Sequence, residues 1–206
     1  MRRRMVEQIR REGRVTDPRI LDAMMRIPRH HFLDSSFEEY AYQDRPFPIG
    51  KDQTISQPTT VALQTQLLDV RKNERILEIG TGSGYQAALL SELGARVFSI
   101  ERFKTLKEKA EKKLNELGYR GIKLFYGDGY QGLPAYAPFH KILVTAAAPE
   151  IPDAFFEQLR EGGVLVVPFG KGSVQVMKRF VRTQEGFKEE SHGNFAFVPM
   201  LRNKAD

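Results

Sequence analysis

The chain has 206 residues, of which 41% are hydrophobic and 28% are charged, a composition typical of one or two globular domains and not of a fibre or a disordered tail. It contains no cysteine, which excludes disulfide frameworks, thiolate metal sites and a catalytic thiol. Lys and Arg outnumber Asp and Glu by 32 to 26, and the resulting net charge of +6 is too modest to indicate a polyanionic partner by itself.

The N-terminus begins with a methionine and three arginines, as a secretory signal does. Residues 5–14, however, alternate apolar side chains with charged or polar ones and contain no apolar segment. The longest strongly apolar stretches, 142–148 and 164–169, are far shorter than the roughly 20 residues that cross a bilayer. We therefore expect a soluble, cytoplasmic protein with no membrane partner.

Residues 1–73 are predicted to form a helical extension with irregular connections. Asp17-Pro18 is a helix start signal, because the Asp side chain accepts hydrogen bonds from free amides and Pro suits the first turn. That helix is expected to end near residue 27. Residues 44–52 contain Pro and Gly and are predicted to be a loop, and a second helix is expected at about 57–68.

From residue 75 short apolar segments alternate with helical patterns. The predicted strands are 75–79, 96–100, 122–126, 141–146 and 163–168, and the predicted helices are 84–93, 103–117 and 152–159. This alternation predicts parallel strands joined by right-handed helical crossovers, which is a doubly wound α/β sheet. Residues 174–181 and 194–201 are predicted to be two further strands at an antiparallel C-terminal edge. We expect a single domain, with 1–73 as its extension and 74–206 as its core.

Ligands of such sheets bind beyond the carboxyl ends of the strands, and a glycine-rich segment lies at the first of them. The segment Glu78-Ile79-Gly80-Thr81-Gly82-Ser83-Gly84-Tyr85 joins a strand to a helix, so its glycines allow a sharp turn and a close approach to bare backbone. An ordinary strand-to-helix turn is the alternative. The dinucleotide fingerprint G-x-G-x-x-G requires glycine at position 85, where this chain has Tyr85, so a bridging pyrophosphate is not expected.

Two acidic residues follow the next two strands. Glu101 stands 21 positions after Gly80, where a carboxylate can accept hydrogen bonds from ribose hydroxyls; the alternative is a surface glutamate. Asp128 lies in Gly127-Asp128-Gly129 and can accept a hydrogen bond from an exocyclic amine such as that of adenine, or form a simple turn. A nucleoside cofactor without the dinucleotide loop indicates S-adenosylmethionine.

The segment 78–85 resembles the first motif of class I S-adenosylmethionine-dependent methyltransferases, and further segments narrow the resemblance to the protein-L-isoaspartate (D-aspartate) O-methyltransferase family. These segments are 53–58, 127–129 with 133–134, 146–149 with 152, 159–170 and 197–200. The most specific is Thr54-Ile55-Ser56-x-Pro58. One departure is Thr59-Thr60-Val61, where many members carry Tyr or His, so contacts made by those side chains are not expected here.

The resemblance implies a Rossmann-like fold and the transfer of a methyl group from S-adenosylmethionine to L-isoaspartyl carboxylates of damaged proteins, with repair through a succinimide. It implies Ser56 as the active-site serine, whereas from the residues alone Ser56 fits a helix cap equally well. The cofactor-binding residues would be Glu78, Gly80, Thr81, Gly82, Ser83, Gly84, Glu101, Asp128 and Gly129, and the substrate-binding residues would be Thr54, Ile55, Ala147 and Ala148.

A carboxylate acceptor suits these residues because its pKa of roughly 4 leaves it deprotonated at neutral pH, so that no general base is required. Residues 145–149 contain no Asp, Glu or His where an enzyme acting on a hydroxyl or amine would place a base. The four histidines show no metal-ligand spacing, and we expect no metal. Residues 42–57, which combine Gly and Pro with Ser56, are the candidate lid.

Two rival functions are a nucleic-acid methyltransferase, which the basic charge suits, and a non-catalytic nucleoside-binding module on the same fold. Cytosine C5 methylation by the usual route needs a cysteine, and amine methylation typically uses an Asp- or Asn-Pro-Pro-aromatic motif where this chain has Ala-Ala-Ala-Pro. We therefore expect isoaspartyl proteins and peptides, and not nucleic acid, as partners of a monomeric enzyme.

Overall fold

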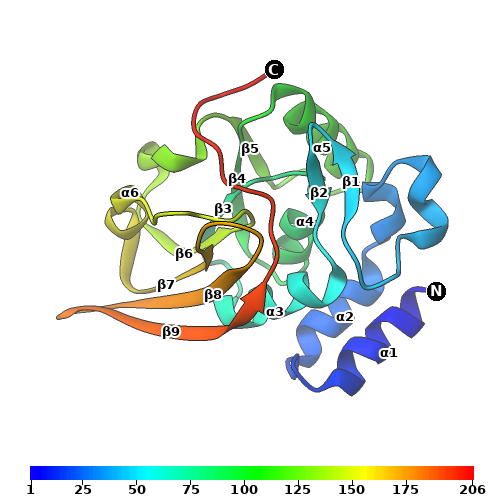
Figure 1. Cartoon of the computed structure of the whole chain (residues 1–206), viewed down its shortest axis with the longest axis horizontal. Coiled ribbons are helices and arrows are strands. Elements are labelled where there is room, and N and C mark those ends of the chain that lie inside the picture. The colour runs from blue at the N-terminus through cyan, green and yellow to red at the C-terminus, as the bar shows by residue number, and fades with distance from the viewer.

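The computed structural model describes all 206 residues around a seven-stranded sheet with helices on both faces (Figure 1). Its strands are β3 (Arg75–Ile79), β4 (Arg96–Glu101), β5 (Lys123–Tyr126), β6 (Phe139–Val144), β7 (Leu159–Phe169), β8 (Gln175–Thr183) and β9 (Gly186–Phe195). The order is β5-β4-β3-β6-β7-β8-β9, in which β3 to β7 are parallel and β8 pairs antiparallel with both β7 and β9. The doubly wound, mostly parallel sheet with an antiparallel edge is confirmed.

Alternation along the strands divides the core between the two faces. Leu77 and Ile79 of β3 pack with Phe155 on one face, whereas Ile76 packs with Ala87 and Leu90 on the other. Phe155 belongs to α6 (Asp153–Glu157), and the two residues of the opposite face belong to α4 (Tyr85–Glu92). Further helices that follow the hairpin or connect the strands are α3 (Pro58–Leu68), α5 (Lys104–Glu116), η3 (Gly129–Gln131) and η4 (Pro134–Tyr136).

The N-terminal extension contains more regular structure than the sequence predicts. It comprises α1 (Arg2–Glu12), α2 (Pro18–Arg26), η1 (Arg29–Phe32), η2 (Ser35–Tyr40), β1 (Phe47–Gly50) and β2 (Gln53–Ile55). Asp17 caps α2 as expected, accepting the Arg19 amide at 2.9 Å. The predicted loop at 44–52 is wrong in part, because 47–50 pairs with β2 as a hairpin that turns through Lys51 and Asp52 at φ values of 54° and 55°.

The predicted position of the last strand, residues 194–201, is wrong. The strand is β9 (Gly186–Phe195), which lies in the segment that its polar composition indicated to be a connection. An edge strand needs only backbone pairing on one side, and charged side chains along it oppose pairing with other molecules. Lys178 and Arg179 of β8 form ion pairs with Glu189 and Glu190 of β9 at 2.6 and 2.9 Å. The apolar pattern of 194–201 instead reflects burial of Met200 beneath the carboxyl end of the sheet.

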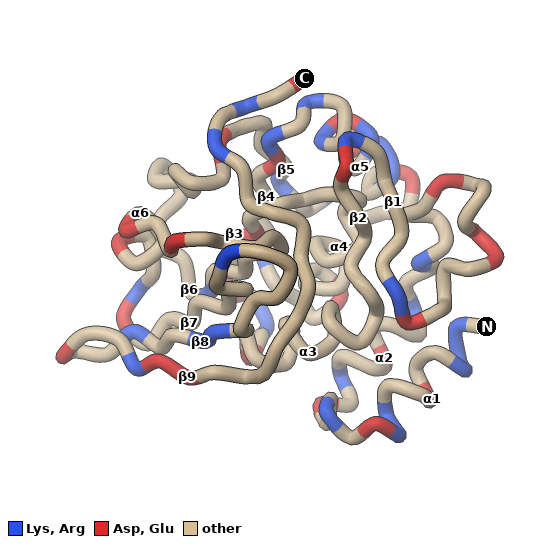
Figure 2. Tube along the Cα trace, in the orientation of Figure 1, with Lys and Arg blue, Asp and Glu red and all other residues tan.

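Basic and acidic residues are interspersed along the chain (Figure 2). On α5 charges of both signs alternate, with ion pairs from Lys107 to Glu111 at 2.8 Å and from Lys113 to Glu116 at 2.9 Å. None of the helices combines the length and the apolar character that crossing a membrane requires.

Candidate active site

The site lies between β3 and β6, where the order of the parallel strands reverses. From β3 the chain continues through β4 and β5 on one side, while β6 and β7 occupy the other side. In open α/β sheets this topology leaves a crevice at the carboxyl ends of the two central strands. The glycine loop, residues 80–84, follows β3 at this point and leads into α4. Its position therefore agrees with the location that the sequence predicts for chemistry.

The backbone conformation of the glycine loop favours glycine at three of its positions. Gly80, Gly82 and Gly84 have φ values of 97°, 53° and 87°, a left-handed conformation that side chains disfavour. A Cβ atom at Gly80 would lie 2.6 Å from Oγ1 of Thr145, which itself lies 2.6 Å from the Gly80 carbonyl oxygen. The loop and the end of β6 are thus in contact, and a side chain at Gly80 would separate them.

Glu78 lies completely buried beneath the loop. Its Oε2 accepts a hydrogen bond of 2.5 Å from the Ser99 hydroxyl, which lies 2.6 Å from the Thr81 hydroxyl, while Oε1 has no hydrogen-bond partner. Burial raises the pKa of Glu78 to about 8, with the Ser99 hydrogen bond opposing the rise and the Glu101 charge adding to it. The carboxyl group is therefore mostly protonated at neutral pH and connects β3 and β4 to the loop through hydroxyls.

Glu101 is a buried connector between β4 and the glycine loop, so the alternative of a surface glutamate is wrong. It is 5% exposed, its Oε2 accepts the Gly82 amide and its Oε1 accepts the Phe103 amide, both at 2.9 Å. Burial raises the pKa of Glu101, and hydrogen bonds from the amides of Phe103 and Gly82 act against this. Two backbone amides aimed at one carboxylate hold it in a single orientation.

Asp128 is a turn residue, as one of the two interpretations drawn from its sequence has it, while a contact with an adenine amine stays a prediction. Its Oδ1 accepts the Tyr130 amide at 2.9 Å and caps η3, as a turn residue does. Its Oδ2 accepts the Asn203 amide at 2.9 Å, which ties the C-terminal segment to the end of β5. Gly129 lies against β3, where a Cβ would approach Ile79 Cγ2 to 2.7 Å.

Ser56 faces the glycine loop across a small cavity of about 40 Å³, called the inner cavity below. Its lining residues are Thr54, Ile55, Ser56, Val61, Gln64, Gly80, Thr81, Gly82, Ser83, Tyr85, Gln86 and Thr145. None of these side chains is acidic or basic. Two segments that are distant in sequence but that we assigned to one site, 54–56 and 80–83, therefore do meet in the structure.

The alternative role of Ser56 as a helix cap is wrong. Helix α3 has Gln57 at its N-cap position, and that residue makes no side-chain capping bond. The capping bond comes instead from a distant residue, because Asp44 Oδ1 accepts the Thr59 amide at 2.8 Å. The Ser56 side chain is thus not engaged in the start of the helix.

The two alanines assigned to substrate binding lie outside the inner cavity. Ala147 and Ala148 are 5% and 0% exposed, and their amides donate to the carbonyls of Val198 and Pro168, both at 2.8 Å. Their side chains face the core, so a contact with substrate through them stays a prediction. The inner cavity is not lined by five further residues assigned to the cofactor, which lie at or near strand ends and in the loops that follow: Glu78, Gly84, Glu101, Asp128 and Gly129.

Several lining residues were missed by the sequence analysis. Tyr85 and Thr145 carried a usable signal, since one ends the glycine motif and the other directly follows β6 at the carboxyl edge. Gln64 carried none: it is a polar residue within a helix, 1% exposed, whose Nε2 donates to the Val144 carbonyl at 2.9 Å. Only the folded chain brings such a residue to the site.

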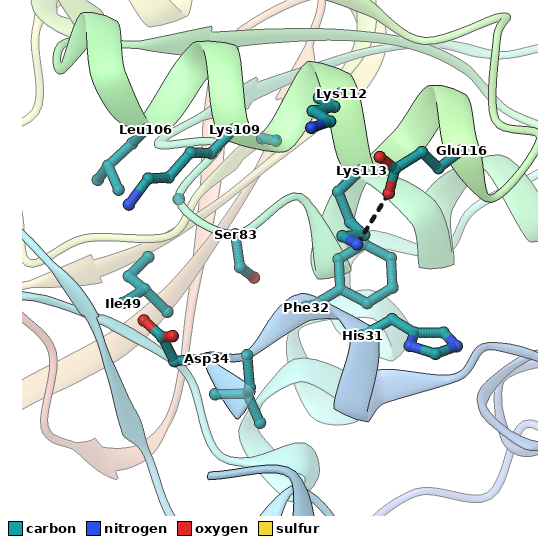
Figure 3. Close-up of a pocket in the computed structure, with 13 residues that line it drawn as sticks. His31, Phe32, Asp34, Ile49, Ser83, Leu106, Lys109, Lys112, Lys113 and Glu116 are labelled. Atoms are coloured by element: carbon teal, nitrogen blue, oxygen red, sulfur yellow. Dashed lines mark hydrogen bonds and ion pairs between the residues drawn. The ribbon is translucent and has the colours of Figure 1, made fainter. Parts of the chain in front are cut away.

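A larger cavity of about 330 Å³, called the outer cavity, borders the other side of the glycine loop (Figure 3). It shares Gly82 and Ser83 with the inner cavity and lies between α5 and η1. Its walls combine apolar side chains such as Phe32 and Leu106 with lysines of α5, of which Lys113 is paired with Glu116. Ser56 is not among its lining residues, so the inner cavity remains the centre of the candidate site.

The sheet order, the glycine loop at the reversal point and the acid after the next strand define a Rossmann-like fold of the S-adenosylmethionine-dependent methyltransferase class. A SAM-dependent O-methyltransferase from Thermotoga maritima shares this fold with a TM-score of 0.53 and 18% identity, over 83% of this chain and 74% of that one. A closer grouping follows from the sequence. The profile of the family "Protein-L-isoaspartate(D-aspartate) O-methyltransferase (PCMT)" matches residues 1–205, and the chain belongs to this family.

Proteins named as members of this family match the chain over nearly its full length. A protein-L-isoaspartate O-methyltransferase of Christiangramia forsetii is 52% identical over 204 residues, which cover 98% of this chain and 95% of the relative. A solved structure named protein-L-isoaspartate O-methyltransferase has a TM-score of 0.89 and 31% identity, covering 98% of this chain and 67% of its own. A putative enzyme of the same name from Plasmodium falciparum, solved with S-adenosyl-L-homocysteine, shares the fold with a TM-score of 0.86 and 23% identity over 98% and 99% of the two chains.

Proposed function

We propose that this protein is a protein-L-isoaspartate O-methyltransferase, which transfers the methyl group of S-adenosylmethionine to the free carboxylate of L-isoaspartyl residues in damaged proteins and peptides. The observation that carries this proposal, together with membership of the family, is the neutral inner cavity between Ser56 and the glycine loop. A carboxylate acceptor is already a deprotonated nucleophile at neutral pH. A cavity that offers hydroxyls and amides but no general base suits that acceptor.

The residues at the carboxyl edge fit the cofactor. The glycine loop offers bare backbone that a Cβ would obstruct, and each oxygen of Glu101 retains acceptor capacity beyond its one backbone bond. We assign the methionine portion to the loop, the ribose hydroxyls to Glu101, and the adenine amine to Asp128 with Gly129. When bound, S-adenosylmethionine supplies a methyl group on a sulfonium, which is an intrinsically good donor.

On the acceptor side Ser56 acts as an orienting hydroxyl. Its side chain lines the inner cavity, and no His–acid pair accompanies it, so it is not a covalent nucleophile. A hydrogen bond from the hydroxyl to the acceptor carboxylate would hold one oxygen in line with the methyl group.

Methylation starts a repair that continues without protein. The carboxylate becomes a methyl ester, the backbone amide nitrogen that follows attacks the ester carbonyl, and methanol leaves as the succinimide ring closes. Hydrolysis of the ring returns part of the material to normal aspartate. The enzyme therefore needs to recognise only the free carboxylate of the isoaspartyl residue within a polypeptide.

The Ser56→Ala variant tests the assignment. We expect kcat for an isoaspartyl peptide to fall about 10- to 100-fold, because an interaction that orients the acceptor in the transition state is lost. Affinity for S-adenosylhomocysteine, measured by calorimetry, should stay within about twofold since the cofactor contacts remain. Ser173→Ala, at an exposed turn, is the matched control and should behave as wild type.

The same assay separates the rival functions. Wild-type enzyme is offered radiolabelled S-adenosylmethionine with an isoaspartyl peptide, its aspartyl counterpart, RNA and DNA. Label in the isoaspartyl peptide alone supports the proposal. Label in nucleic acid alone would overturn it in favour of a nucleic-acid methyltransferase, and tight cofactor binding with no transfer would favour a binding module. Wild-type turnover by Ser56→Ala would refute the role of the serine.

A further inference from the structure

Arg29, the first residue of η1, is completely buried. Arginine is rarely buried to this extent unless a partner compensates its charge. Here the hydrogen bonds go to two backbone carbonyls: Nε donates to Ala41 at 2.9 Å and Nη2 donates to Ser56 at 2.7 Å. Nη1 is buried without a partner. A buried charge bonded to neutral groups costs stability, so its presence calls for a functional explanation.

The guanidinium also stacks on the helix that follows the glycine loop. Its central carbon lies 4.8 Å from the ring centroid of Tyr85, which is 1% exposed and is the first residue of α4. Phe32 packs edge-on against the same ring, at 5.5 Å between centroids. One side chain therefore joins three segments: the connection before β1, the Ser56 backbone and the end of the glycine loop.

The charge of Arg29 persists in this environment. Burial lowers the pKa of Arg29 to about 10, and nearby Tyr85 and Asp44 oppose the shift. At neutral pH the guanidinium therefore stays protonated. Charged donors make hydrogen bonds roughly twice as strong as neutral ones, so the Ser56 carbonyl is held by one of the stronger contacts in the region.

Ser56 depends on such an anchor because its side chain provides none. The hydroxyl lines the inner cavity and has no hydrogen-bond partner in the protein, and its position follows from the backbone. On one side Ile55 pairs with Phe47 in the hairpin, and on the other side α3 begins at Pro58. The bond from Arg29 fixes the residue between these two elements.

We propose that Arg29 is a positioning residue for methyl transfer, which sets the Ser56 hydroxyl relative to the glycine loop through the Ser56 carbonyl and the Tyr85 ring. This inference rests on the proposed role of Ser56. It assigns Arg29 no contact with substrate or cofactor. Its effect is to hold the Ser56 hydroxyl at a fixed position relative to the transferred methyl group.

The first test is Arg29→Lys, which keeps the charge but cannot donate to both carbonyls with the geometry of a guanidinium. We expect kcat to fall about 10- to 100-fold, as displacement of a reacting group by about 1 Å does, with S-adenosylhomocysteine affinity within about twofold of wild type. The matched control is Arg179→Lys, whose Nε bonds the Leu67 carbonyl at 2.8 Å away from the inner cavity; its kcat should not change.

A double-mutant cycle separates positioning from general support. If Arg29 acts through Ser56, then Arg29→Lys should cost less than about twofold in kcat once Ser56 has been replaced by Ala. Losses that multiply in the double variant would show that Arg29 merely supports the fold and would overturn the proposal. Tyr85→Leu, which keeps both hydrogen bonds but removes the ring, should show the same coupling at smaller amplitude and serves if Arg29→Lys does not fold.

Hydrogen exchange tests the contact between Arg29 and Ser56 independently of enzyme activity. In Arg29→Lys the amides of segment 53–57 should exchange faster than in wild type, while those of β3 stay unchanged. Unchanged exchange in 53–57 would overturn the positioning role. Failure of the wild-type protein to methylate isoaspartyl peptides would instead overturn the proposed function, so the two failures are distinguishable.

Discussion

The two sides of the site differ in how they use charge. The side assigned to the cofactor has carboxyl groups after or near the ends of three strands, at Glu78, Glu101 and Asp128. The side assigned to the acceptor is lined by hydroxyls and amides, with the buried Arg29 behind Ser56. Glu101 and Asp128 hold the glycine loop and the C-terminal segment through backbone amides, while no acidic side chain lines the space beside Ser56.

Electrostatics explains this separation. Two like charges at 4 Å near a protein surface repel by about 4 kcal/mol, enough to exclude a carboxylate substrate from a site that contains an ionised acid. The acids of this site are compensated: Glu101 and Asp128 each accept two backbone amides, and Glu78 is mostly protonated. An acceptor carboxylate in the inner cavity therefore meets hydroxyl donors, with the guanidinium of Arg29 buried behind Ser56.

The largest expected effect concerns the state of Glu78. Its pKa is about 8 in the folded protein and near 4.5 in the unfolded chain, so the folded state binds one more proton between these values. Stability is then greatest at the acidic end of this window and declines as pH rises through it, by at most about 1.4 kcal/mol per pH unit. The Glu78→Gln variant has no titrating carboxyl group at this position, so the free energy of unfolding of the variant should depend less on pH.

Urea unfolding of wild type and Glu78→Gln at intervals from about pH 5 to about pH 8 measures the difference. The free energy of unfolding of wild type should decline relative to the variant over this range. Glu116→Gln, which changes an exposed acid of α5, is the control and should run parallel to wild type. A constant difference between wild type and Glu78→Gln would show that Glu78 is ionised, and the contrast between the two sides would weaken.

The second largest effect, that of Glu101→Gln, should change the cofactor side and leave the acceptor side unchanged. In Glu101→Gln an amide nitrogen must face one of the backbone amides that the carboxylate accepts, so one bond to a charged group is lost. Such bonds contribute about 1.5–3 kcal/mol, and we expect the Kd for S-adenosylhomocysteine to rise about 10- to 100-fold. The KM for isoaspartyl peptide at saturating cofactor should change less than about twofold. Equal changes in both constants would contradict the division.

The sequence could predict the core and the cofactor side because both follow local rules. Alternating strands and helices define the sheet, and the order of strand ends places 80–84, Glu101 and Asp128 along one edge. The acceptor side depends on contacts between distant segments. Arg29 lies 27 positions from Ser56 and Asp44 lies 15 positions from Thr59, and neither spacing is periodic. Hairpin β1–β2 was missed because its two strands are short and bury few apolar side chains, among them Phe47 and Ile55. Strand β9 was missed because it forms by backbone pairing with β8 and not by burial of an apolar face.

The smallest effect tests one of these distant contacts. Asp44 Oδ1 accepts the Thr59 amide at 2.8 Å and so caps α3 from outside the helix, directly after Ser56. Loss of such a cap costs about 1 kcal/mol, and Asp44→Ala should lower the free energy of unfolding by about this amount. Because the cap belongs to the acceptor side, affinity for S-adenosylhomocysteine should remain within about twofold.

Asp44→Asn distinguishes the cap from the charge. An asparagine oxygen can still accept the Thr59 amide, whereas the negative charge that raises the pKa of Arg29 is lost. If capping dominates, Asp44→Asn should retain most of the stability that Asp44→Ala loses, as measured by urea unfolding. If both variants lose the same free energy of unfolding, the charge of Asp44 beside Arg29 is what stabilises this region. One acidic side chain then stabilises the acceptor side from behind, although no acidic side chain lines the inner cavity.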